Sequence, residues 1–138
     1  MSIRALPLLV FAFILYNLIV LVMGGENPVA ALDSPIFTAR LLSGGDWTFT
    51  WGDLILLITL ILLFVELVKS TFTTTSTLID HALSMIVFIA VLVEFLMVKQ
   101  AATSVFFLIL MATLIDVIAG YTIGIRVARR DLNIGADQ

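Results

Sequence analysis

The chain has 138 residues, of which 62% are hydrophobic and 12% are charged, and its formal net charge is -3. About a quarter of the residues in a soluble domain are charged, so this composition excludes an ordinary soluble domain and indicates a chain that folds in lipid. Cysteine is absent and there is one histidine. Disulfides, thiol catalysis and thiolate metal sites are therefore excluded, and we expect neither a metal site nor a cofactor.

Four apolar stretches are long enough to cross a bilayer, because a spanning helix needs about 20 predominantly apolar residues. They predict spans at 5–23, 51–69, 78–98 and 103–126. The predicted fold class is therefore all-α, with residues 1–138 forming a single membrane domain of four transmembrane helices. The first apolar run is longer than the core of a signal peptide, which favours an uncleaved anchor.

The first span carries Asn17, an amide that lipid cannot satisfy. We expect it to face another helix and to make a packing hydrogen bond rather than a substrate contact. Residues 24–50 then form the one long connection. Within it, Ile36–Leu42 is expected to form one or two interfacial helical turns, and Trp47 and Trp51 mark the level at which the second span begins, because tryptophan favours the headgroup region.

The second and third spans carry most of the remaining ionisable groups. Glu66 and Lys69 are spaced to pair at i,i+3 as a couple at the membrane interface. The third span has polar and apolar residues in a 4-3-4-3-4 spacing, which is a heptad seam that faces other helices. Its members are Asp80, Ser84, Val87, Val91, Glu94 and Val98, and His81 lies beside it.

The fourth span has a stripe of small residues at i+4 that also contains an acid: Ala112, Asp116, Gly120 and Gly124. Small residues let two helix backbones approach closely, so we expect helix packing here, tightest at Gly120 and Gly124. Asp116 is the deepest acid, with no basic residue in reach on its own helix. We expect it to be protonated, to pair with another subunit, or to bond one of Asn17, Tyr16, Thr59 and Thr113.

The distribution of basic residues predicts the orientation. One side of the predicted bundle collects five, namely Arg4, Lys69, Arg126, Arg129 and Arg130, against Arg40 and Lys99 on the other. The side richer in basic residues is cytoplasmic. We therefore expect a multi-pass protein of an inner (plasma) membrane, with both termini cytoplasmic and the 24–50 loop outside.

Two functions fit the polar residues inside the predicted membrane, which are Asp116, Glu94, Glu66, His81 and Asn17. In the favoured interpretation they fix helix packing in a non-enzymatic accessory or assembly subunit, whose partners are lipid and either further copies or other membrane proteins. In the alternative they form a stepped set of protonatable groups in a small oligomeric proton or ion translocator. No catalytic motif points to an enzyme, and the clustering of only three arginines does not support nucleic-acid binding.

Overall fold

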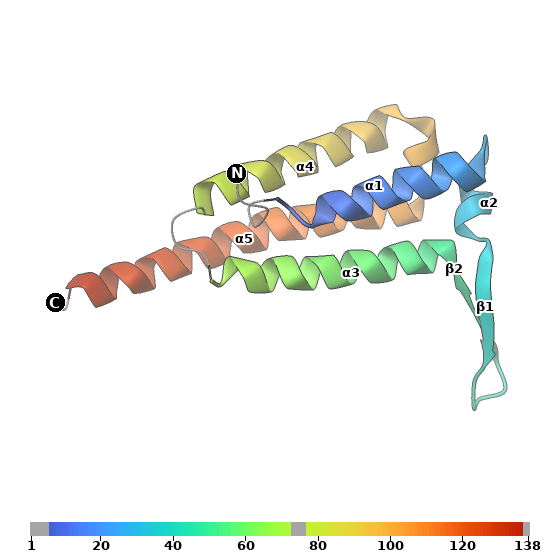
Figure 1. Cartoon of the computed structure of the whole chain (residues 1–138), viewed down its shortest axis with the longest axis horizontal. Coiled ribbons are helices and arrows are strands. Elements are labelled where there is room, and N and C mark those ends of the chain that lie inside the picture. Colours follow the sequence, from blue (N-terminus) through green and yellow to red (C-terminus); the bar gives the residue numbers. More distant parts are fainter. Residues whose placement is uncertain (1–5, 73–76, 137–138) are drawn as a thin grey trace.

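The computed structural model describes residues 6–72 and 77–136, and these residues are mostly helical. Four helices lie side by side in an elongated bundle, and consecutive ones run in opposite directions (Figure 1). They are α1 (Leu9–Ile19, continued by a π-helical turn, Val20–Gly24), α3 (Trp51–Ser70), α4 (Thr77–Met97) and α5 (Ser104–Ala136). A short 3-10 turn, Lys99–Ala101, reverses the chain between α4 and α5.

In the part of the chain that the structure describes, three helices are long and apolar enough to cross a bilayer: Trp51–Ser70, Ile79–Met97 and Ser104–Gly135. The bounds of α3 and α4 lie within one residue of the predicted second and third spans. The helix Leu9–Gly24 is apolar but shorter than the predicted 5–23, and Arg4 and Ala5 lie outside the described residues.

Helix α5 continues well past the predicted end at residue 126, and its last turns project beyond the bundle (Figure 1). The sequence after Arg126 contains alanine, arginine and leucine, which favour helix, and no glycine or proline until Gly135. The arginines therefore do not end the helix.

A hairpin replaces the helical turns expected at Ile36–Leu42, so that prediction was wrong. Strand β1 (Pro35–Arg40) pairs antiparallel with β2 (Asp46–Thr50), and Phe37 lies opposite Phe49. Aromatic residues alternate with threonine in β2, which is a strand pattern. Gly44, in the connecting turn, has a φ of 86°, a conformation that glycine adopts without strain.

The hairpin and the short helix α2 (Pro28–Leu32) join α1 to α3 at one end of the bundle, here called the hairpin end (Figure 1). Helix α1 begins at the opposite end, where α5 also leaves the bundle. The packed core near the hairpin end centres on Tyr16 and Phe106, whose ring centroids lie 4.9 Å apart. The Tyr16 hydroxyl donates to the Gln100 carbonyl at 2.8 Å and lies 2.7 Å from the Thr103 hydroxyl, which ties α1 to the turn before α5.

Candidate functional site

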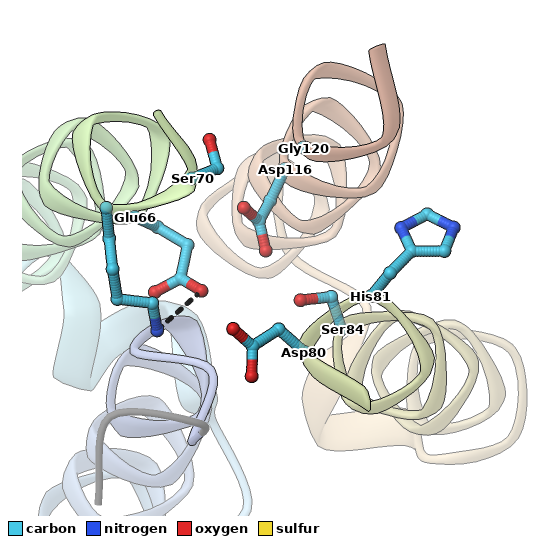
Figure 2. Close-up of a pocket in the computed structure, with 8 residues that line it drawn as sticks. Glu66, Ser70, Asp80, His81, Ser84, Asp116 and Gly120 are labelled. Carbon is cyan, nitrogen blue, oxygen red and sulfur yellow. Dashed lines mark ion pairs between the residues drawn. The ribbon is translucent and has the colours of Figure 1, made fainter. Parts of the chain in front are cut away.

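A polar pocket lies in the bundle near the end opposite the hairpin, where α3, α4 and α5 meet. Its cavity of about 30 Å³ has room for one or two water molecules. The lining residues are Glu66, Lys69, Ser70, Asp80, His81, Ser84, Asp116 and Gly120. Figure 2 shows the carboxylates of Glu66, Asp80 and Asp116 turned toward a common centre, with the Ser84 hydroxyl beside them. The fold therefore gathers three acids from three helices.

Glu66 links α3 to the start of α1. One carboxylate oxygen, Oε1, lies 3.1 Å from Nζ of Lys69, which confirms the predicted i,i+3 pair. The other, Oε2, accepts a hydrogen bond from the backbone N–H of Leu8 at 3.1 Å. An anion at the N-terminus of a helix satisfies a backbone donor that has no partner inside the helix. Lys69 also donates to the carbonyl of Leu6 at 3.4 Å, so both members of the pair hold the beginning of α1.

Asp116 links α5 to α4. It is only 5% exposed, and its carboxyl group faces the Ser84 hydroxyl across the helix interface, where both line the pocket (Figure 2). The four partners considered from the sequence hydrogen-bond elsewhere. Thr59, Thr113 and Asn17 each bond a carbonyl of their own helix, and Tyr16 bonds Gln100. The seam of α4 predicts that Ser84 faces inward, and Asp116 occupies the facing position on α5.

Glu94 and Asn17 form a separate polar contact toward the hairpin end. The Asn17 side chain lies near enough to the Glu94 carboxylate to interact with it between α1 and α4, and Nδ2 of Asn17 donates to the Phe13 carbonyl at 3.0 Å. Asn17 therefore faces another helix, as its amide predicted.

An apolar layer separates this contact from the pocket. Glu94 is ten residues beyond Ser84, roughly 15 Å along α4. Val87 and Val91 lie on the inner face between them, and Val91 packs with Ile109 and Leu110 of α5 in the buried core. Among the described residues, the predicted stepped set of acids is therefore divided in two. Glu66 and Asp116 lie at the pocket, Glu94 lies with Asn17, and apolar side chains pack between the two places.

His81 is among the residues that line the pocket, but its ring points away from the acids (Figure 2). The ring lies against Tyr121, with centroids 5.0 Å apart and planes at 35°. It also lines a shallow groove on the outside of α4 and α5 with Val117, Ile118, Tyr121 and Thr122. His81 therefore does not face Glu66, with which the sequence grouped it.

The small-residue stripe of α5 packs differently from the prediction. Ala112 is buried against Leu9 and Leu63, and Gly124 is buried. A Cβ at Gly120, however, would meet no atom of the described residues within 4 Å, and this residue borders the pocket. The expected tight approach at Gly120 is therefore not made among residues 6–72 and 77–136.

The tight glycine is Gly52, in the first turn of α3, which sequence reasoning missed. A Cβ there would lie 3.1 Å from Cγ2 of Val105 and 3.2 Å from the carbonyl oxygen of Leu32. Helices α2, α3 and α5 meet at this point. A single glycine in the first turn of a helix gives no periodic signal, so the sequence offered no means of finding it.

Comparison with known protein families, curated proteins and solved structures finds no match for the chain. In residues 6–72 and 77–136, no three or more acidic or histidine side chains are placed to hold a metal ion. The site is thus a set of polar links between helices, gathered around a cavity the size of one or two waters.

Proposed function

We propose that this chain is a non-enzymatic integral membrane protein that acts as an accessory or assembly subunit, packing with further copies or with other membrane proteins. The supporting observation is that Glu66 accepts a hydrogen bond from the start of α1, and that Asp116 and Glu94 each face a polar side chain of another helix, Ser84 and Asn17 respectively. Polar groups are costly inside a bilayer unless they are paired, and between helices they fix packing. A role in linking helices accounts for the presence of these acids inside the bundle without a role in proton transport.

The proposed topology has four spans, with both termini on the cytoplasmic side. Helix α1 with its π-helical turn is roughly 24 Å long, slightly short of a 30 Å hydrocarbon core. Local thinning of the bilayer accommodates such a helix. Asn17 and Tyr16 join α1 to α4 and to the turn before α5, so α1 lies within the bundle. Lys69 and the arginines of α5 lie at the end opposite the hairpin, which the basic-residue rule assigns to the cytoplasm.

The outer surface of the bundle favours a role in assembly. An apolar groove of about 220 Å³ runs between α3 and α5, lined by Leu56, Thr59, Leu60, Leu63, Leu108, Met111, Ala112 and Ile115. Leu60, Leu108 and Ile115 are exposed along this groove, and van der Waals packing is a main source of helix association in lipid. We therefore place the packing surface for a partner helix at this groove.

Purification from native membranes in mild detergent, followed by mass spectrometry and size analysis, tests the proposal. We expect a stoichiometric membrane-protein partner or a defined homo-oligomer. Ile115→Trp fills the groove and should release the partner, whereas Ile89→Trp, on the exposed face of α4, is the matched control and should retain it. A folded monomer without a partner would contradict the assembly role.

A small oligomeric proton or ion translocator is the second candidate. Its supporting observation is the gathering of Glu66, Asp80 and Asp116 around a water-sized cavity. Chains of acidic groups relay protons in pumps and transporters. Because Val91 and Ile109 pack between this cluster and Glu94, a continuous path would have to form between subunits. Measurement of ion and proton flux with purified protein in liposomes distinguishes the two candidates.

A further inference from the structure

The β1–β2 hairpin has one aromatic face and one polar face. Side chains alternate between the faces of a strand, and opposed residues share a face. Phe37 lies opposite Phe49, and Ala39 lies opposite Trp47. The other face carries Thr38 opposite Thr48 and Arg40 opposite Asp46, and the two threonine hydroxyls lie 3.0 Å apart. One face of the hairpin is therefore apolar and the opposite face is polar.

The aromatic face is not covered by the other residues that the structure describes. Phe37 stacks on Phe49 with centroids 5.1 Å apart, and Trp47 packs edge-on against both rings. Phe37 and Trp47 nevertheless remain 49% and 47% exposed. Leu42, at the tip, is fully exposed. A two-stranded hairpin is only marginally stable by itself in water, so this face requires a further surface against which to pack.

The attachment of the hairpin fixes its level along the bundle. Strand β2 ends at Thr50 and α3 begins at Trp51 with no residue between them. The Thr50 side chain accepts from the backbone N–H of Asp53, while the Asp53 carboxylate accepts from that of Thr50, so the junction is a closed capping box. The base of β2 therefore lies where α3 begins, at the hairpin end of the bundle.

The hairpin runs sideways from this junction, across the direction of the helices (Figure 1). Six residues of β1 extend roughly 20 Å at about 3.3 Å per residue. A hairpin continuing along the helix axis would leave the headgroup region within a few residues, whereas this one stays at a single level over its whole length.

We propose that the hairpin lies flat on the lipid surface at the outer end of the bundle, with Phe37, Trp47 and Phe49 inserted among the headgroups. This inference rests on the proposed spanning topology. Tryptophan favours this region because its ring is amphipathic. The outer edges of the two strands carry backbone groups without strand partners, and hydrocarbon cannot satisfy such groups. The hairpin therefore stays in the interface, with its polar face toward water.

Tryptophan fluorescence tests this placement, because the chain has two tryptophans. Trp51→Phe leaves Trp47 as the only tryptophan, which excitation at about 295 nm selects over the two tyrosines. In liposomes we expect a blue-shifted Trp47 emission that lipids brominated near the headgroup quench and that added iodide does not. Phe37→Ser, which removes an aromatic ring beside Trp47, should reduce the quenching by brominated lipid.

Two results would overturn the inference. Quenching by iodide and not by brominated lipid would place the hairpin in water, and protection from both quenchers would mean that protein covers it. Carbonate extraction of the same liposomes separates this failure from that of the topology. A chain that resists extraction while Trp47 is open to iodide refutes the hairpin placement alone, whereas a chain released by carbonate refutes the spanning proposal.

Discussion

The carboxylate of Glu66 accepts a hydrogen bond at 3.1 Å from the backbone N–H of Leu8, 58 residues earlier in the chain. The Glu66 side chain therefore joins the last third of α3 to the start of α1. Its other oxygen holds Lys69, which in turn reaches the Leu6 carbonyl. A residue that sequence spacing assigns to a local ion pair is thus also a link between two helices.

Replacing Glu66 tests this link. Glu66→Leu leaves the Leu8 N–H and the Lys69 ammonium without their acceptor, and we expect the free energy of unfolding to fall by about 1–3 kcal/mol. Glu66→Gln keeps an oxygen for Leu8 and should cost less. Unfolding titrations in detergent micelles measure both, with Glu26→Gln in the exposed loop as the control. Equal stability of the Leu and Gln variants would show that the Leu8 bond contributes nothing.

The contact between Asp116 and Ser84 can be measured with a double-mutant cycle. Residues in direct contact couple by about 0.5–3 kcal/mol, and independent sites add. We expect Asp116→Leu and Ser84→Ala to be non-additive in unfolding free energy. Ser70→Ala is the control, because the Ser70 hydroxyl lines the same pocket but donates to the Leu67 carbonyl. If the effects of Asp116→Leu and Ser84→Ala on the unfolding free energy were additive, the two side chains would not interact.

Two glycines of the long helices should respond oppositely to alanine. A Cβ at Gly52 would press on Val105 and on the Leu32 carbonyl, and such overpacking costs about 1–3 kcal/mol. Gly120 has open space around it, so Gly120→Ala should stabilise the helix by about 0.5–1 kcal/mol. Thermal unfolding in detergent compares them. If Gly120→Ala destabilised the protein, the result would indicate that Gly120 packs closely against a partner molecule.

The sequence predicted what depends on local spacing. Helices α3 and α4, the inward seam of α4 as far as Glu94 and the Glu66–Lys69 pair all follow from residues within a turn or two of one another, whereas the last predicted seam residue, Val98, lies beyond α4 and is exposed. The links of Glu66 to Leu8 and of Asp116 to Ser84 join positions far apart in the chain, and no periodicity carries that information. Asn17 could be predicted in part. Its amide predicted that it faces another helix, but not that Glu94 is the residue it faces.

The helical prediction for the loop between α1 and α3 was wrong for a physical reason. The sequence predicts one or two interfacial helical turns at Ile36–Leu42, where the structure has strand β1. The alternation of aromatic residues with threonine in 46–50, and the two glycines between the segments, are hairpin signals. Strand pairing joins the two segments, so neither segment alone shows the structure.

The number of spans can be tested with tags at the two ends of the chain. If α1 crosses the bilayer, four spans place both tags on the cytoplasmic side, and a reporter inserted beside Gly44 lies outside. If α1 does not cross, the N-terminal tag lies on the opposite side from the C-terminal tag. Accessibility of the tags to a membrane-impermeant reagent in intact cells and in lysed cells decides between three and four spans.

The central claim is that the buried acids hold the helices together and do not carry protons. Proton flux through liposomes containing the purified wild-type protein or Asp116→Asn tests it most directly, because asparagine keeps a hydrogen-bonding side chain for Ser84 but cannot exchange a proton. We expect both proteins to remain folded and assembled, and neither to exceed the leak of protein-free liposomes. Flux through the wild type that Asp116→Asn abolishes, while folding and assembly persist, would contradict the account.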